Sequence, residues 1–276
     1  MNKAVKVIRF YKTGGSDVLK IEGIQISQLK ANEVLVRVQA VTVSRPDLLW
    51  REGSYFEEPE FPAQIGYDAA GIVESIGPEV KTLKVGDRVS TFPAVSLLDY
   101  AAHGETIIYP ETALIVYPES LTPVQAASVN TGLFTAYFAL LELAYLKRDQ
   151  HVVITAASSS MGVAAIPMAR AIGAKSIAVT RSEAKKDALL GVGADQVIIA
   201  SREDVQEAIL ELTEGRRGSD LRRCCRPRTR RACVGNKKIR PCHRLRKPWG
   251  NGIRDTAASW RMLPEGHQGI WQFPSF

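Results

Sequence analysis

Hydrophobic and polar residues alternate in short stretches throughout the first 120 residues of the chain. The stretches at 34–41, 70–77 and 87–92 follow a period of two, and glycine and proline residues interrupt the chain between them. This period is typical of β-strands that bury one face and expose the other. Residues 1–120 are therefore predicted to form a β domain with irregular connections.

The pattern changes at residue 121, where helices begin. Thr122 and Gln125 have the spacing of a capping box around Pro123, and an apolar helix over 126–146 should follow. Beyond it, strands that are apolar throughout alternate with helices, which indicates a parallel sheet covered on both faces. The strands are expected at 151–156, 176–180 and 196–200, and the helices at 160–172, 182–190 and 202–213. The fold class is thus α/β, and the βαβαβα order within residues 121–220 corresponds to half of a doubly wound dinucleotide-binding domain.

The segment between the first of these strands and its helix is a candidate phosphate-binding loop. A dinucleotide-binding fingerprint requires small residues at three places, and Ala157, Ser159 and Gly162 occupy them, so one of the three glycines is present. The serines add hydroxyl donors at a helix N-terminus, which favours anions. The alternative is a small-residue helix start that binds no ligand. The candidate cofactor contacts are Ala157, Ser158, Ser159, Ser160, Met161 and Gly162.

The end of the second apolar strand distinguishes between the two nicotinamide cofactors. NAD sites usually have Asp or Glu here for the ribose hydroxyls. This chain instead has Thr180, Arg181 and Ser182, with Lys185 one turn later. Hydroxyl donors and positive charge suit a 2′-phosphate, so Thr180, Arg181 and Lys185 favour NADP(H) over NAD(H). The alternative is that Arg181 and Lys185 are solvated side chains at the start of a helix.

Several longer strings carry a family resemblance. They are AVTVSRPDLLWREGSY at 40–55, PAQIGYDAAGIVESIGPEV at 62–80, KVGDRVS at 84–90, LFTAYFAL at 133–140 and the segment 152–195. In these strings and in the order of its domains, the chain resembles the medium-chain dehydrogenase/reductase superfamily, most of all its zinc-lacking, quinone-oxidoreductase-like branch. The resemblance implies a GroES-like β domain at 1–120, followed by a Rossmann domain. It also implies hydride transfer between a nicotinamide cofactor and quinones, enones or related carbonyls.

The resemblance also bears on metal binding. Zinc-dependent members of the superfamily have cysteine where this chain has Ser44, and His-Glu where it has Tyr67 and Asp68. A hydroxyl and a phenol are poor zinc ligands beside a thiolate and an imidazole, so we expect no metal. His103 is a lone histidine in a predicted loop and is interpreted as a surface or packed residue.

Four residues match positions that line the cleft in members of the superfamily, namely Ser44, Asp47, Tyr55 and Tyr67. Ser44, Tyr55 and Tyr67 are the candidate catalytic residues, because without zinc a hydroxyl or a water must donate to the carbonyl oxygen of the substrate. For the tyrosines the alternative is an ordinary buried side chain with a satisfied hydroxyl. Asp47 is expected to have a structural role, and Thr135 is expected to approach the nicotinamide.

The composition changes after residue 221. Residues 222–276 contain 14 Lys or Arg and 2 Asp or Glu, whereas the 221 residues before them contain 22 and 27. All four cysteines lie in this tail, so the preceding residues have no disulfide and no cysteine-bound metal.

The N-terminal sequence has no signal-peptide core, and we expect a cytoplasmic protein without a membrane partner.

Three interpretations of the tail at 221–276 stay open. The tail shows no apolar period and no fourth strand, so the Rossmann domain is either truncated or out of frame from about residue 221, and a disordered tail follows. Such a chain would be an oxidoreductase by descent that could lack hydride transfer, and the homodimer edge usual in the superfamily would be missing. Alternatively, the basic tail makes the chain a non-catalytic binding protein for nucleic acid. A zinc site formed by Cys224, Cys225, Cys233, Cys242 and His243 is the third possibility, although the spacing matches no standard site.

Overall fold

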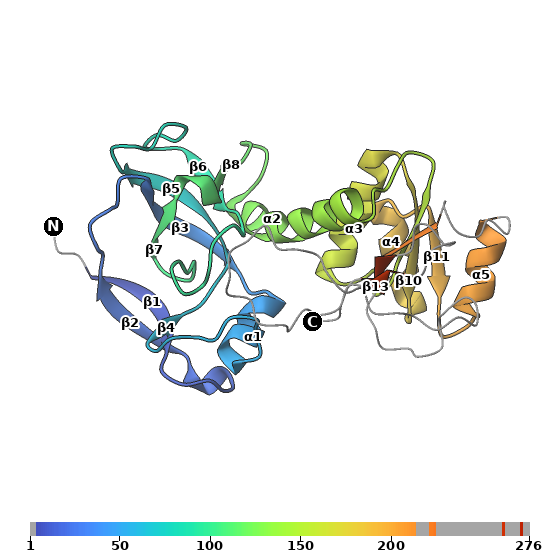
Figure 1. Cartoon of the computed structure of the whole chain (residues 1–276), viewed down its shortest axis with the longest axis horizontal. Coiled ribbons are helices and arrows are strands. Elements are labelled where there is room, and N and C mark those ends of the chain that lie inside the picture. The colour runs from blue at the N-terminus through green and yellow to red at the C-terminus, as the bar shows by residue number, and fades with distance from the viewer. Residues whose placement is uncertain (1–3, 214–220, 225–260, 263–270, 273–276) are drawn as a thin grey trace. The chain divides into compact units, whose positions relative to one another are not determined.

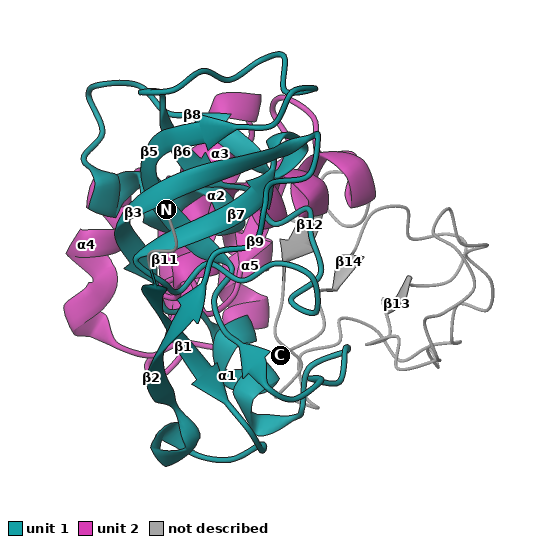
Figure 2. Ribbon diagram, turned by 90° about the vertical axis from the view of Figure 1, so that its left-hand side faces the viewer, with its two compact units in different colours: residues 1–131 teal, residues 132–276 magenta. Residues whose placement is uncertain are grey.

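The computed structural model describes residues 4–213 and, for the backbone alone, residues 221–224, 261–262 and 271–272. The chain divides into two compact units, residues 1–131 and residues 132–276, which Figure 2 shows in different colours. The first unit is built on antiparallel sheets, and the main sheet of the second is parallel. The predicted α/β fold class is confirmed.

Unit 1 contains two antiparallel sheets (Figure 1). A three-stranded sheet has the order β2-β1-β4, and a five-stranded sheet has the order β7-β3-β5-β6-β8. The strands are β1 (Ala4–Phe10), β2 (Lys20–Gln25), β3 (Glu33–Thr42), β4 (Ala63–Gln64), β5 (Asp68–Ile76), β6 (Arg88–Thr91), β7 (Thr106–Pro110) and β8 (Leu114–Val116). The helical elements between them are α1 (Arg45–Glu52) and the 3-10 turns Ser16–Val18 and Glu111–Ala113.

The three strands predicted from the period of two appear as β3, β5 and β6. Val34, Val36 and Val73 are almost fully buried in one core cluster, as expected for alternate residues on the inner face of a sheet. β3 and β5 approach closely at Gly71, where an added Cβ would lie 2.1 Å from the carbonyl oxygen of Arg37. A side chain at residue 71 would therefore force the two strands apart.

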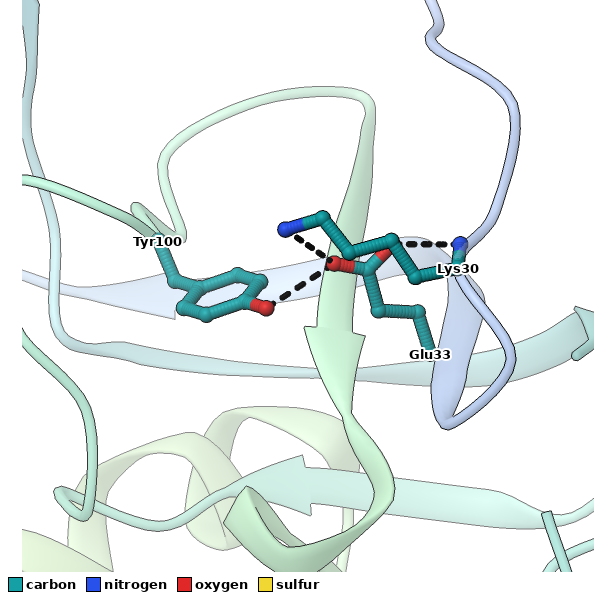
Figure 3. Close-up of polar contacts among 3 residues, drawn as sticks. All are labelled: Lys30, Glu33 and Tyr100. Atoms are coloured by element: carbon teal, nitrogen blue, oxygen red, sulfur yellow. Dashed lines mark hydrogen bonds and ion pairs between the residues drawn. The ribbon is translucent and has the colours of Figure 1, made fainter. Parts of the chain in front are cut away.

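A buried carboxylate holds the turn before β3. Figure 3 shows Tyr100 and the ammonium group of Lys30 directed at the Glu33 carboxylate. The Tyr100 hydroxyl donates to Oε1 at 2.8 Å, the Lys30 ammonium lies 3.2 Å from the same oxygen, and the Lys30 amide donates to Oε2 at 2.8 Å. Burial disfavours the charged form, but these contacts outweigh burial and lower the pKa of Glu33. Glu33 thus has a structural role.

Helix α2 (Pro123–Tyr137) begins at the predicted capping box and continues into a π-helical segment, Phe138–Leu143. The Thr122 amide donates to Gln125 Oε1 at 2.9 Å and the Gln125 amide to Thr122 Oγ1 at 3.3 Å, which confirms the box. Among the described residues, 123–143 is the one helical stretch that is long and apolar enough to cross a membrane. Length and composition alone do not distinguish such a helix from the core helix of a soluble protein.

Unit 2 is organised around a parallel sheet with the order β11-β10-β9-β12. Its elements are β9 (His151–Ile154), α3 (Ser160–Ile172), β10 (Lys175–Thr180), a 3-10 turn (Glu183–Lys185), α4 (Lys186–Val192), β11 (Gln196–Ile199), α5 (Val205–Leu212) and β12 (Leu221–Cys224). The predicted alternation of strands and helices is confirmed, and α3 has the predicted bounds. The helix predicted at 182–190 begins later, at residue 186, because the 3-10 turn replaces its first turn.

Both faces of this sheet are covered. Val152 and Ile154 belong to a core cluster with residues of α3 and α4, whereas Val153, Ile177 and Val179 pack with residues of α5. Figure 1 shows α3 and α4 on one side of the strands and α5 on the other. Successive residues of a strand point to opposite faces, so a strand covered on both faces must be apolar throughout.

The sequence predicts no fourth strand after residue 220, and this prediction is wrong. The backbone of β12 pairs in parallel with β9, from Leu221 opposite His151 to Cys224 opposite Ile154. A short antiparallel pair, β13 (Arg261–Met262) and β14 (Trp271–Gln272), likewise lies where no strand is expected. Strand pairing uses backbone groups, which a search for apolar periods does not detect. The other expectations for the tail, namely the shifted frame, disorder, nucleic-acid binding and zinc, lie outside the described residues.

Candidate functional site

Ser44 and Asp47 lie at the N-terminus of α1. Ser44 is the N-cap residue, and its amide and hydroxyl donate to Asp47 Oδ2 at 2.6 and 2.8 Å. The Asp47 side chain is completely buried, and its Oδ1 accepts from the backbone amide of Tyr67 at 3.2 Å. Asp47 therefore links the start of α1 to the residue before β5 and orients Ser44 and Tyr67 together.

Tyr55 and Tyr67 meet through their hydroxyl groups. The Tyr55 hydroxyl donates to the Tyr67 hydroxyl at 3.2 Å, and the two ring centroids lie 6.1 Å apart at an angle of 61°. Trp50 packs edge-on against Tyr55, and its indole N–H donates to the Gln64 carbonyl at 2.8 Å. The three predicted catalytic residues thus share one network, in which Ser44 is connected to Tyr67 through Asp47.

Both phenols are neutral at physiological pH. Burial raises the pKa of Tyr55 to about 12. Burial also raises the pKa of Tyr67. A neutral phenol keeps its O–H and can donate a hydrogen bond or a proton.

Asp68 is a buried polar residue, for which the sequence indicated only a replaced metal ligand. Its Oδ1 accepts from the Thr131 hydroxyl at 2.6 Å, across 63 residues of sequence. Burial raises the pKa of Asp68 to about 6, the hydrogen bond from Thr131 lowers it, and the nearby charge of Asp47 adds to the increase. The signal in the sequence that could have identified Asp68 is its position as a carboxylate at the start of β5, a largely apolar strand.

His103 is a packed residue, which is one of the two predicted possibilities. Its Nε2 donates to the Thr42 carbonyl at 3.1 Å, and its ring lies against Gly66, where an added Cβ would be 2.1 Å from Cδ2. Across the part of the chain that the structure describes, no group of three or more His, Cys, Asp or Glu is arranged to hold a metal ion. Ser44 and Tyr67, which stand at the zinc-ligand positions of the resemblance, are hydrogen-bonded to Asp47 and Tyr55.

The candidate phosphate-binding loop lies in unit 2, between β9 and α3. Ser159 is the N-cap of α3, and its hydroxyl accepts from the Gly162 amide at 3.2 Å. Ala157 is completely buried, and an added Cβ at Gly162 would lie 2.4 Å from the Ala157 carbonyl oxygen. Gly162 thus holds the fingerprint place that permits close packing of the helix on the strand. Ser158, Ser159 and Ser160 are exposed, and Met161 is half-buried.

Lys185 reaches this loop from the turn before α4. Its ammonium group donates to the Ser158 hydroxyl at 3.2 Å, across 27 residues of sequence. Arg181 is exposed at the end of β10, whereas Thr180 is buried and its hydroxyl accepts from the Ser182 amide at 3.3 Å. The structure therefore brings Lys185 and Ser158 together. The Thr180 hydroxyl is instead hydrogen-bonded to the backbone just after β10. Thr135, the remaining candidate, is half-buried on α2.

Two family models match the chain. Residues 30–140 match the alcohol dehydrogenase GroES-like domain, and residues 160–222 match the zinc-binding dehydrogenase model. The predicted GroES-like and Rossmann domain types are therefore confirmed.

Individual relatives agree with these matches. The chain is 35% identical to a quinone oxidoreductase of Sus scrofa over 196 residues, which make up 71% of this chain and 58% of that protein. The structure of Escherichia coli quinone oxidoreductase complexed with NADPH is similar with a TM-score of 0.68 and 28% identity, covering 84% of this chain and 76% of that one. A quinone oxidoreductase of Pseudomonas syringae has a TM-score of 0.69 and 28% identity, with 80% and 72% covered.

Proposed function

Because the chain belongs to the quinone-oxidoreductase-like branch of the medium-chain dehydrogenase/reductase superfamily, we propose that it is an NADPH-dependent oxidoreductase. Its substrate would be a conjugated carbonyl compound, a quinone or an enone, and its reaction a hydride transfer without zinc. The observation that carries the proposal is the Tyr55–Tyr67 hydroxyl pair, which provides a neutral proton donor. The chain spans 58% of the length of the Sus scrofa relative, so the activity of the whole protein is part of this proposal.

NADPH would supply the hydride, and the loop at 157–162 would hold its pyrophosphate. The exposed serine hydroxyls at the N-terminus of α3 fit an anion, and Gly162 lets the start of the helix pack closely on the Ala157 backbone. Lys185, with Arg181 nearby in sequence, would provide the positive charge for the 2′-phosphate. Thr180 would contact the 2′-phosphate through its backbone, since its hydroxyl accepts a hydrogen bond from the Ser182 amide. Thr135 would approach the nicotinamide.

Tyr67 is the proposed proton donor to the carbonyl oxygen of the substrate. The Tyr55 hydroxyl donates to the Tyr67 oxygen, which leaves the Tyr67 proton to be given to an acceptor. As that proton moves, the hydrogen bond from Tyr55 stabilises the developing negative charge on the Tyr67 oxygen. The Ser44 hydroxyl donates its hydrogen bond to the Asp47 carboxylate and not to the substrate, so Ser44 acts as a positioning residue in this scheme.

The same proposal covers metal, location and partners. Ser44 and Tyr67 present a hydroxyl and a phenol, which are weak zinc ligands, so the reaction would need no zinc. We propose a cytoplasmic protein that acts on a small molecule, without a membrane or nucleic-acid partner. The family resemblance implies a homodimer whose edge would be missing from this chain, so the oligomeric state is part of the test.

The test is NADPH consumption by the purified full chain with menadione as substrate. We expect NADPH to be oxidised faster than NADH, and dialysis against a chelator to leave the rate unchanged. Tyr67→Phe should lower kcat by about 100-fold, because the proton donor is lost. Tyr145→Phe is the matched control, since Tyr145 is 65% exposed and lies in the other unit.

Three outcomes would contradict parts of the proposal. A chain that neither binds NADPH in a fluorescence titration nor consumes it is not an oxidoreductase. Binding of NADPH without its oxidation would make the chain a nucleotide-binding protein that is not an enzyme. A Tyr67→Phe variant as active as the Tyr145→Phe control would remove the tyrosine pair from the mechanism.

A further inference from the structure

An exposed aromatic side chain adjoins the tyrosine pair. Trp50 is 1% exposed and Tyr67 is 6% exposed, whereas Phe56, in the same group of rings, is 56% exposed. The Phe56 ring centroid lies 4.2 Å from that of Tyr55, at an angle of 44°. Phe56 therefore extends this group of rings to the protein surface.

The backbone on either side of Phe56 is held in place. Tyr55 is fixed by its hydrogen bond to Tyr67 and by its edge contact with Trp50. On the other side, the Glu57 carboxylate accepts from the Ser96 hydroxyl at 3.0 Å, across 39 residues of sequence. Phe56 thus presents its ring at a defined position, with the Tyr55 ring between it and Tyr67, the proposed proton donor.

We propose that Phe56 determines specificity by stacking on the flat conjugated rings of the substrate, and that the site therefore prefers fused-ring quinones to small acyclic enones. The inference rests on the proposed function and adds the substrate class to it. Offset aromatic pairs stabilise one another beyond the area that they bury, whereas an acyclic enone has no ring to stack. Exposed Phe56 has no comparable role in the core of unit 1, so its replacement should leave the fold intact.

The test compares Phe56→Leu with Phe61→Leu. Phe61 is 47% exposed and contacts only Phe10 among the ring pairs of the described residues, so it is matched in exposure and lies outside the tyrosine pair. We expect Phe56→Leu to raise KM for menadione about three- to tenfold with little change in kcat. KM for 3-buten-2-one should change less than about twofold, and Phe61→Leu should leave both values as in the wild type. Equal losses for the two substrates, or no loss for menadione, would overturn the inference.

A second measurement separates this inference from the proposed function. If the wild-type chain reduces neither compound, 1-naphthol serves as a fused-ring probe that cannot be reduced, and its binding is followed by tryptophan fluorescence. Weaker binding of 1-naphthol to Phe56→Leu by about three- to tenfold supports the stacking role even though the reaction is absent. Unchanged binding, or no binding to the wild type, refutes it.

Discussion

Replacement of Gly162 by alanine probes the packing on which the proposed cofactor loop depends. An added Cβ would lie 2.4 Å from the Ala157 carbonyl oxygen and 2.6 Å from its carbonyl carbon and Cα. These are backbone atoms and cannot rotate away, so restoring an ordinary contact of 3.4 Å requires the start of α3 to move away from the Ala157 backbone by about 1 Å. Overpacking of this kind costs about 1–3 kcal/mol.

Hydrogen exchange is the suitable assay, because a chain with two units need not unfold in one step. Peptides that cover β9 and α3 should exchange faster in Gly162→Ala, by an amount equivalent to about 1–3 kcal/mol of opening free energy. Peptides from unit 1 should be unaffected. The affinity for NADPH should fall as well, because the first amides of α3 are displaced with the helix.

Gly191→Ala is the matched control. Gly191 lies in α4 and has nothing within 4 Å of an added Cβ, so alanine there should stabilise the helix by up to about 1 kcal/mol. The two glycine substitutions should thus shift exchange in opposite directions. If Gly162→Ala exchanges like the wild type, or shifts in the same direction as Gly191→Ala, then close packing of α3 on the Ala157 backbone is not the reason for a glycine at residue 162.

Two further predictions concern charged residues. Lys185→Gln should weaken NADPH binding about tenfold and NADH binding less than about twofold, because NADH carries no 2′-phosphate; equal losses in a fluorescence titration would contradict the assignment. Asp68→Asn should change the pH dependence of stability, since burial raises the pKa of Asp68 from 3.8 to about 6 in the folded state. Wild-type stability should be full below about pH 4 and fall by about 2–3 kcal/mol as pH rises through about 6. Urea unfolding of Asp68→Asn should lack this fall, and a variant that keeps it would show that another group is responsible.

Much of the fold could be predicted because its causes are local. Thr122 and Gln125 are three residues apart, and α3 ends at Gly173, whose φ of 84° suits glycine. The strands of unit 2 had to be apolar throughout, because helices cover both faces of their sheet. Where a local preference was weak, the prediction missed: α4 begins four residues late, after a 3-10 turn.

The contacts of the candidate site could not be predicted in the same way. Lys185 and Ser158 are 27 residues apart, Asp68 and Thr131 are 63 apart, and Tyr55 and Tyr67 are 12 apart in connecting segments. The sequence could nominate hydroxyl and amine groups by their chemistry, but it could not show which of them meet.

The sequence by itself determined the order of strands and helices, the two domain types and a plausible set of chemical groups. The tertiary structure alone decided that two tyrosine hydroxyls form a pair, that Asp47 orients the residue before β5, and that β12 joins the parallel sheet. The physical reason is the range of the interactions. Periodicity and capping act over a few residues, whereas burial, pKa shifts and strand pairing depend on groups that only the folded chain brings together.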